Sequence, residues 1–250
     1  MNQSGATGRG QGPGMPEAAG SPVITPAMED YLKRIYRLQA DGPDVATQRL
    51  ADEIGFSGPS VTNMVKRLHE LRLVAHTPYH GVRLTPAGER VALEVIRHHR
   101  LLELYLAETL GYGWDQVHEE AERLEHHVSD ELEARMDSAL GFPTHDPHGD
   151  PIPSPSGQMP RISNLRLLDL EPGIAAVVVR VSDRDPEQLR FLGGLGVRPG
   201  VTVALIERLP FDGPLRITVD GAEHVIGQPL AMSVNVRTPL QELLDDSGGR

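Results

Sequence analysis

The chain has 250 residues, enough for two domains, and a formal charge of −11 from 24 Lys+Arg and 35 Asp+Glu. It contains no cysteine. Disulfides, thiolate metal sites and cysteine nucleophiles are therefore excluded, and a metal site must use oxygen and imidazole ligands. The charge argues against indiscriminate nucleic-acid binding, and neither a membrane span nor a secretion signal is evident, so we expect a cytoplasmic protein without membrane contact.

The charge is distributed unevenly along the chain. Residues 25–100 hold 11 Lys+Arg against 9 Asp+Glu, whereas residues 101–140 hold 2 against 11. This contrast suggests one part that meets an anion and another part that meets cations.

The amino-terminal 24 residues are rich in Gly, Pro, Ala and Ser and lack apolar periodicity, which predicts a disordered tail. A first helix is predicted from Pro26, with Thr25 as its N-cap, up to "DGPD" at 41–44. It places Met28 and other apolar residues on one stripe.

Two amphipathic helices follow, over 47–55 and 57–74, and the very short turn between them predicts a helix-turn-helix. Gly55 supplies the left-handed exit from the first of them. Two short strands around His80-Gly81 predict a winged hairpin.

Three further helices are predicted, over 86–110, 114–127 and 129–140. Residues 141–160 are dense in Pro and Gly and predict an extended linker. Beyond the linker, short apolar runs between turn signals predict a small all-β barrel.

The predicted helix at 114–127 contains an unusual number of groups that can bind a metal. Glu122, Glu125 and His126 stand at i, i+3 and i+4, with His118 one turn earlier, so one helix face presents all four. Carboxylates so close together repel unless a cation lies between them. A solvated, charged helix face is the ordinary explanation of such a run, and this segment alone favours it.

Several motifs occur in an order that resembles the diphtheria toxin repressor family of metal-dependent transcriptional regulators. They are "MEDYLKRIY" (28–36), "SGPSVTNMVKRL" (57–68), "LTPAGERVA" (84–92), "HHRLLELYL" (98–106), "VHEEAERLEHHVSDELEARM" (117–136), "HGDPIP" (148–153), "LGVRPG" (195–200) and "FDGP" (211–214). The resemblance covers nearly everything after the tail.

The resemblance implies an α+β chain in six parts. These are the tail (1–24), a winged helix-turn-helix DNA-binding domain (25–92), a helical dimerisation and metal-binding domain (93–140), a Pro-rich linker (141–160), a small SH3-like β-barrel domain (161–240) and a C-terminal tail (241–250). It also implies a homodimer that binds double-stranded operator DNA when divalent metal ions fix its winged domains.

The resemblance further implies two metal sites. One uses Asp30, Glu122, Glu125 and His126, and the other uses His99, Glu103 and His118. Taken singly, Asp30 could be an ordinary first-turn acid and His118 an ordinary surface histidine. His98 and His127 lie on another helix face and are not predicted as ligands. Manganese-selective members have a further acid where this chain has Lys33, so the geometry of a two-metal site is in question.

Short polar residues on the predicted recognition helix indicate a DNA-binding surface. The predicted DNA contacts are Arg49, Ser57, Pro59, Ser60, Thr62, Asn63, Lys66 and Arg67. Few long side chains among them would reach the bases, so DNA shape should contribute to specificity as well as direct hydrogen bonds. Capping alone would also account for the serine and the proline that begin this helix.

Two rival functions use the same residues. A carboxylate-metal enzyme is disfavoured because "HEEAE" at 118–122 lacks the second histidine of the zinc-protease pattern, so no enzyme is predicted. A winged-helix regulator of an organic ligand would need an apolar pocket, whereas the candidate effector site is ionic.

The metal is predicted to be Mn²⁺, with Fe²⁺ as the alternative. Iron-responsive relatives have sulfur ligands at the positions of Asp30 and Glu122, and hard carboxylate oxygens suit Mn²⁺ better. The family usually represses metal-uptake genes, which is the function expected here. Acids near Asp183 to Glu187 leave open whether the SH3-like domain supplies ligands.

Overall fold

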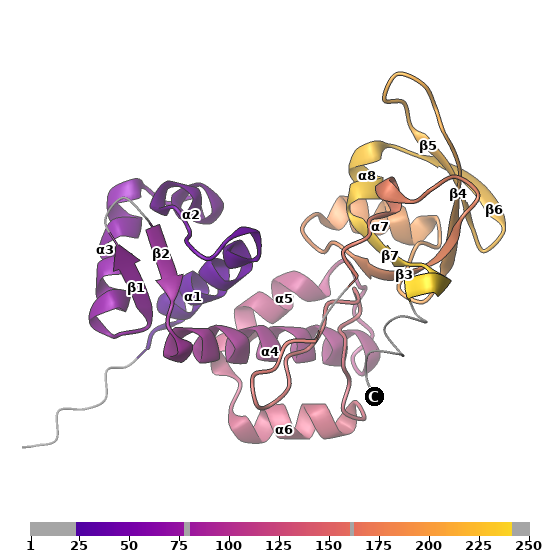
Figure 1. Cartoon of the computed structure of the whole chain (residues 1–250). Coiled ribbons are helices and arrows are strands. Elements are labelled where there is room, and N and C mark those ends of the chain that lie inside the picture. The colour runs from indigo at the N-terminus through magenta and orange to yellow at the C-terminus, as the bar shows by residue number, and fades with distance from the viewer. Residues whose placement is uncertain (1–23, 78–80, 161–162, 242–250) are drawn as a thin grey trace, which may run out of the picture.

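The computed structural model describes residues 24–77, 81–160 and 163–241. These residues form a helix-turn-helix unit with a two-stranded wing, a central group of helices and a C-terminal five-stranded sheet (Figure 1). The predicted α+β fold class is confirmed. The predicted tails lie outside the described residues except for Ile24 and Gln241, and so does His80 of the predicted wing turn.

The amino-terminal unit consists of α1 (Pro26–Leu38), η1 (Gln39–Asp41), α2 (Thr47–Ile54), α3 (Gly58–Glu70), β1 (Val74–Thr77) and β2 (Gly81–Leu84). Gly55 ends α2 in the left-handed region, with φ 76°, as its position predicted. Helix α3 is shorter than predicted because Arg72, with φ 59°, turns the chain and Val74 already begins β1. The strands pair antiparallel, with Val74 opposite Leu84.

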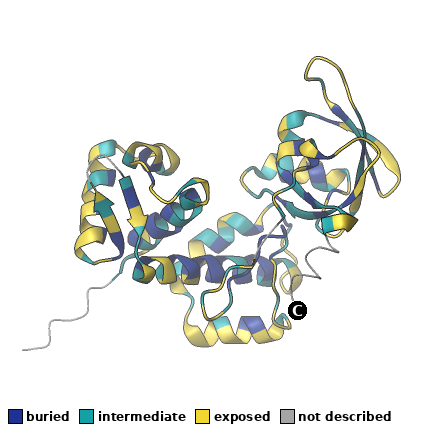
Figure 2. Cartoon of the chain, viewed as in Figure 1, coloured by how far each residue is buried: buried dark blue, intermediate teal, exposed yellow. Residues whose placement is uncertain are grey.

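Helix α4 (Pro86–Glu108) crosses the middle of the molecule and contacts α1, α5 (Val117–Leu124) and α6 (Asp130–Ala139) (Figure 1). Its start is fixed by Pro86 in the first turn and by the Thr85 side chain, which accepts a hydrogen bond from Gly88 N at 3.2 Å. Residues along most of its length are buried (Figure 2). Side chains on α4 are therefore held rigidly between the neighbouring helices.

The prediction of one helix over 114–127 is wrong at both ends. Helix α5 begins at Val117 and ends at Leu124, and Glu125–His127 form a 3₁₀ turn, η2. The helix cannot continue because Val128 is extended and the Ser129 side chain caps α6, accepting from Leu132 N at 3.3 Å.

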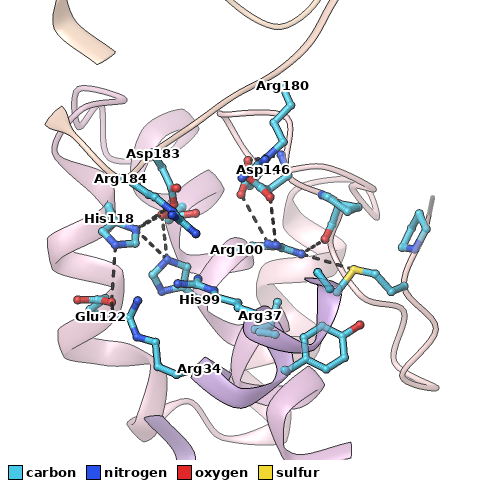
Figure 3. A pocket seen from close by; sticks show the side chains of 18 of the residues that line it. Arg34, Arg37, His99, Arg100, His118, Glu122, Asp146, Arg180, Asp183 and Arg184 are labelled. Atoms are coloured by element: carbon cyan, nitrogen blue, oxygen red, sulfur yellow. Dashed lines mark hydrogen bonds and ion pairs between the residues drawn. The ribbon is translucent and has the colours of Figure 1, made fainter. Parts of the chain in front are cut away.

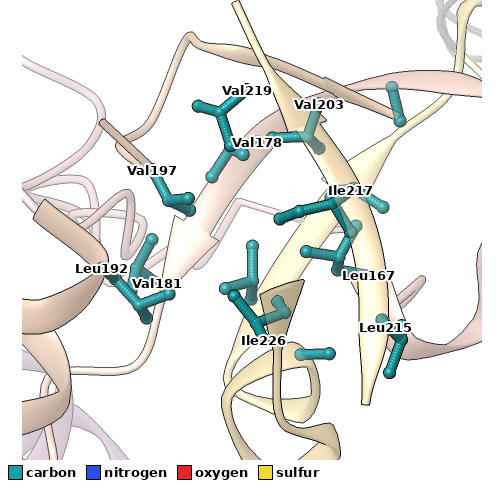
Figure 4. Close-up of a cluster of buried hydrophobic side chains, with 14 of the residues drawn as sticks. Leu167, Val178, Val181, Leu192, Val197, Val203, Leu215, Ile217, Val219 and Ile226 are labelled. Atoms are coloured by element: carbon teal, nitrogen blue, oxygen red, sulfur yellow. The ribbon is translucent and has the colours of Figure 1, made fainter. Parts of the chain in front are cut away.

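The C-terminal sheet is antiparallel, with strand order β6-β5-β4-β3-β7. Its strands are β3 (Ala175–Val181), β4 (Thr202–Arg208), β5 (Leu215–Val219), β6 (Ala222–Ile226) and β7 (Val234–Arg237). Val178, Val203 and Ile217 lie together in its core (Figure 4). Buried and more exposed residues alternate along β3, β4 and β5, as expected for strands with one face on the core.

The all-β expectation for this unit is wrong in detail. The structure contains η3 (Leu167–Asp169), α7 (Pro186–Gly194) and α8 (Gln228–Met232) in addition to the strands. Asp185 caps α7, since its side chain accepts from Glu187 N and Gln188 N. Leu189 and Leu192 of α7 are buried in the core of the sheet.

The segment at 141–160 is irregular but buried in its middle. Asp146, His148, Asp150 and Ile152 are all buried, and His145 forms an isolated bridge with Pro151. Val181 N of β3 donates to His148 O at 2.8 Å, so the segment is hydrogen-bonded to the C-terminal sheet. None of the helices in the described parts of the chain has the length and apolarity that a membrane crossing requires.

Candidate metal centre and recognition helix

Three of the predicted ligands meet between α1 and η2. Asp30 projects from α1, and Glu125 and His126 belong to η2; one ligand atom from each lies within 4.8 Å of the others. His126 Nε2 is 3.2 Å from Asp30 Oδ1 and 3.5 Å from Glu125 Oε1. His126 Nδ1 also lies 2.6 Å from Glu29 Oε2, which fixes the orientation of the ring.

Glu122, predicted as a fourth ligand of this group, lies elsewhere in the structure. Its side chain is 38% exposed, and its Oε1 lies 3.6 Å from His118 Nε2 and 3.5 Å from Arg34 Nη2. Helix α5 ends between Glu122 and Glu125, so the two carboxylates no longer share one helix face. The role of Glu122 as a metal ligand stays a prediction.

The second predicted set does come together, with His99 and Glu103 on α4 and His118 on α5 (Figure 3). Glu103 Oε1 lies 3.0 Å from both His99 Nε2 and His118 Nδ1. The two ring nitrogens are 3.1 Å apart. His99 and Glu103 are fully buried, so three potential ligand atoms converge at one place in the interior.

Asp183 completes this group from the segment after β3, a residue that the sequence left open. Its Oδ2 lies 3.2 Å from His118 Nδ1 (Figure 3). Burial would raise the pKa of Asp183, but the hydrogen bond and charge of His118 hold it well below its usual range. Burial would also lower the pKa of His118, but hydrogen bonds to Asp183 and Glu103 raise it to about 10. Without a metal ion, a proton on His118 therefore balances the two acids.

A third donor set shares Glu103 and was not predicted. It consists of Glu103, Asp146 and His148, all buried. His148 Nε2 lies 2.6 Å from the Trp114 carbonyl oxygen and donates to it. The other ring nitrogen, Nδ1, lies 3.9 Å from Glu103 Oε2.

Neither of these buried atoms has a hydrogen-bond partner among the described residues. Buried polar atoms without a partner are costly, and a bound cation would satisfy both the carboxylate oxygen and a ring nitrogen that offers its lone pair. Burial, together with the charges of Glu103 and Asp150, raises the pKa of Asp146 well above its usual range. Arg100 opposes this shift, because its Nε lies 3.9 Å from Asp146 Oδ2. The sequence feature that could have indicated the Glu103–Asp146–His148 set is "HDPHGD" at 145–150, a run of His and Asp inside the predicted linker.

His99 contacts both the first and the second group of candidate ligands. Its Nδ1 lies 2.5 Å from Glu125 Oε2, and its Nε2 faces Glu103 and His118. Ligating histidines commonly donate their second N–H to a carboxylate in this way, which orients the ring. Glu125 is thus a candidate ligand in the first group, and it also orients His99, a candidate ligand in the second.

A cavity of about 580 Å³ adjoins the second group (Figure 3). Its lining combines buried carboxylates with five arginines, Arg34, Arg37, Arg100, Arg180 and Arg184. Two of these are paired with one acid: Arg100 and Arg180 bind the two oxygens of Asp150 at 3.2 and 2.8 Å. Charged groups of both signs line the cavity, so it is not the largely apolar pocket that the rival organic-ligand function would need.

The donor chemistry fits a hard or borderline divalent ion. All candidate ligands are carboxylate oxygens and imidazole nitrogens, the donors that suit Mn²⁺ and Fe²⁺. The unpaired buried atoms of Glu103 and His148 add a structural reason for a cation.

The predicted recognition helix, α3, presents its polar residues outward. Val61, Val65 and Leu68 are buried, whereas the predicted contacts Ser57, Pro59, Ser60, Asn63, Lys66 and Arg67 are exposed and Thr62 is half-buried. Thr62 donates to Gly58 O at 2.9 Å, and Arg49 on α2 is exposed and paired with Asp41. The predicted DNA contacts are thus available on one side of the helix-turn-helix.

Comparison with known families accounts for all three units. Residues 23–82 match the iron dependent repressor, N-terminal DNA binding domain, and residues 85–154 match the iron dependent repressor, metal binding and dimerisation domain. Residues 165–238 match the FeoA domain.

Individual relatives agree with these matches. The diphtheria toxin repressor of Corynebacterium efficiens is 33% identical over 218 residues, covering 83% of this chain and 94% of that protein. The iron-dependent repressor IdeR of Mycobacterium tuberculosis is 32% identical over 209 residues, with coverages of 79% and 90%.

A solved structure of a manganese-dependent transcriptional repressor in complex with manganese superimposes with a TM-score of 0.78 at 41% identity, covering 84% of this chain and 99% of that one. The relatives are DNA-binding transcriptional repressors, which confirms the prediction that the chain is not an enzyme. The chain belongs to the diphtheria toxin repressor family of metal-dependent transcriptional repressors.

Proposed function

We propose that the chain is a manganese-dependent regulator that binds double-stranded operator DNA as a metal-loaded homodimer and represses metal-uptake genes. Fe²⁺ is the alternative metal. The observation that supports this most directly is the convergence of buried carboxylate and imidazole groups around Glu103, two of whose atoms, Glu103 Oε2 and His148 Nδ1, have no hydrogen-bond partner among the described residues. A manganese-dependent repressor among the similar structures favours the same metal.

The first group would hold an ion through Asp30, Glu125 and His126. Asp30 lies on α1, which packs against the helix-turn-helix and α4, whereas Glu125 and His126 lie on η2. The bound ion would join ligands from both segments, so that Asp30 ties the DNA-binding unit to the central helices. The separation of the two recognition helices in a dimer would then match two operator half-sites.

The second site would use Glu103 with His99 and His118, as predicted, and we add Asp183, Asp146 and His148 as candidates. Glu103 presents one oxygen to each donor set: Oε1 faces His99 and His118, and Oε2 faces His148. Asp183 and His148 would join the C-terminal unit and the 141–160 segment to α4. Metal binding would thus also secure the SH3-like domain.

On the recognition helix, we propose that Ser57, Ser60, Thr62 and Asn63 meet phosphates and base edges. Pro59 would contact apolar base surface, and Arg49, Lys66 and Arg67 would hold the DNA backbone.

Operator binding is expected to require metal. In footprinting with the dimeric protein, saturating Mn²⁺ should raise operator affinity by roughly 10–100-fold over the protein in chelator, the usual size of such a coupling. A parallel anaerobic titration with Fe²⁺ ranks the two metals by the concentration that gives half of full binding. Equal affinity in Mn²⁺ and in chelator would refute the proposal.

Metal binding is expected to release protons. The pKa of His118 lies at about 10 without metal, so at pH 7 the ring is protonated, whereas a ligand nitrogen must be neutral. Mn²⁺ affinity should therefore rise with pH below that value. Calorimetry in two buffers with different ionisation enthalpies measures the protons released.

The control for this experiment is His127→Gln, because His127 is exposed and lies outside the donor groups. That variant should release as many protons as the wild type, and His118→Gln should release about one fewer. Identical heats in both buffers would contradict the assignment of His118.

A further inference from the structure

Lys33 on α1 is buried almost completely. Its side chain is 1% exposed and is among the largest fully buried side chains of the described residues. Lysine is almost never buried in this way unless its charge is paired, because removing an ammonium from water is unfavourable. The surroundings of Lys33 must therefore supply negative charge.

That charge comes from the candidate metal centre. Lys33 Nζ forms a buried ion pair with Glu125 Oε1, and Glu122 Oε1 lies 3.9 Å from the same nitrogen. Glu125 Oε1 is also the oxygen that lies 3.5 Å from His126 Nε2. One carboxylate oxygen thus faces the ammonium of Lys33 and a candidate metal ligand.

The ammonium of Lys33 is within ion-pair distance of two carboxylates, Glu122 and Glu125. It is covalently attached to α1 one turn after Asp30, so it cannot diffuse away. A divalent ion held by Asp30, Glu125 and His126 would meet this fixed positive charge at close range, and a second ion between Glu122 and Glu125 would have no room.

We propose that Lys33 is a resident cation that limits the Asp30–Glu125–His126 group to one divalent ion and lowers its affinity for that ion. The proposal rests on the proposed function of this group as a metal site. It makes Lys33 a determinant of metal stoichiometry and sensitivity.

A purely structural ion pair predicts the opposite effect of neutralising Lys33. If the ammonium served only to hold Glu125 in place, Lys33→Gln would disorder a ligand and weaken metal binding. If the ammonium competes with the metal, Lys33→Gln should tighten Mn²⁺ binding by about tenfold, the effect of one nearby unit charge. The direction of the change separates the two explanations.

The test counts Mn²⁺ directly and does not rely on DNA binding. Wild-type dimer, Lys33→Gln and Lys33→Glu are equilibrated with Mn²⁺ by dialysis, and bound metal is measured by elemental analysis and by electron paramagnetic resonance. Lys33→Glu should bind one more Mn²⁺ per protomer than the wild type, with the spectral coupling of two neighbouring Mn²⁺ ions. Lys33→Gln should keep the wild-type number at higher affinity.

Arg34→Gln is the matched control. It removes the same charge from the next residue of α1, which pairs with Glu122 at 3.5 Å but not with Glu125. Its Mn²⁺ affinity should change by less than about threefold, because the guanidinium is partly exposed and screened.

The possible results are distinct. Unchanged or weakened Mn²⁺ binding by Lys33→Gln overturns the proposal, and so does a Lys33→Gln protein that fails to fold with Mn²⁺ present, since the ammonium would then be required for structure. Lys33→Glu with the wild-type number of ions also overturns it; if Lys33→Glu does not fold, Lys33→Gln decides. A wild-type protein that binds no Mn²⁺ refutes the proposed function itself.

Discussion

Replacing Glu125 with alanine is expected to abolish the response of operator binding to Mn²⁺. Glu125 is 1% exposed and contacts Lys33 and His126 through one oxygen and His99, at 2.5 Å, through the other. Its loss removes a charged ligand from the first group and the hydrogen-bond acceptor that orients His99 in the second. The Mn²⁺ concentration for half-maximal operator binding should rise by more than about 100-fold.

The same change leaves the buried ammonium of Lys33 with Glu122, at 3.9 Å, in place of its closer partner Glu125. Breaking a buried pair by removing one partner typically costs about 3–5 kcal/mol of unfolding free energy. Stability and metal response must therefore be measured separately, by urea denaturation without metal and by fluorescence anisotropy of labelled operator with metal. The double variant Lys33→Gln with Glu125→Gln should recover much of the stability but not the metal response.

Glu119→Ala provides the matched control, because Glu119 lies on α5, is 72% exposed and pairs only with exposed Arg123 at 3.5 Å. It should shift the free energy of unfolding by no more than about 0.5 kcal/mol and leave the response to Mn²⁺ intact. A Glu125→Ala protein that responds to Mn²⁺ like Glu119→Ala would remove Glu125 from the metal centre.

Gly149→Ala should have the second large effect, on the Glu103–Asp146–His148 set. Gly149 has φ 86°, and a Cβ there would stand 2.0 Å from Val179 O and 3.0 Å from Arg180 Cα. Neither backbone atom belongs to a flexible side chain, so the 146–150 loop would have to move away from β3. We expect the unfolding free energy to fall by about 2–4 kcal/mol and the metal bound by this set to be lost.

Gly157→Ala separates the steric effect from backbone strain. Gly157 lies in the same segment with φ 78°, but the nearest atom to a new Cβ is Leu93 Cδ1 at 3.7 Å. This variant should lose only about 1 kcal/mol, from the left-handed backbone, and keep the wild-type metal content. Equal metal content in both glycine variants would show that the position of the loop does not matter to the metal.

The sequence predicted the parts of the site that local patterns determine. His99 and Glu103 lie four residues apart on a continuous helix, and helical geometry alone brings them together. Asp30 and His126 are separated by 96 residues, and only the family resemblance predicted that they would meet. Glu122 was placed with Glu125 because the pattern gave no sign that α5 ends at Leu124.

The ligand candidates that were missed lie where local patterns contain the least information. Asp146 and His148 belong to a Pro- and Gly-rich segment whose composition predicts an exposed linker, yet both are buried by packing against distant parts of the chain. Asp183 approaches His118 across a domain boundary, which no periodicity in either segment indicates. The family resemblance shows that Lys33 stands where manganese-selective members have an acid. Its ion pair with Glu125 cannot be predicted from the sequence, because the two residues meet only in the folded chain.

The contact between Asp183 and His118 has a consequence for protein synthesis. The ribosome synthesises the chain from its amino terminus, so α1, α4 and α5 can fold before Asp183 has been added. A nascent chain of about 160 residues would contain the recognition helix, His118 and His148. It would not yet contain Asp183 or the β3 backbone that hydrogen-bonds to His148. The donor set around Glu103 is therefore completed late in translation, after the DNA-binding surface has already emerged.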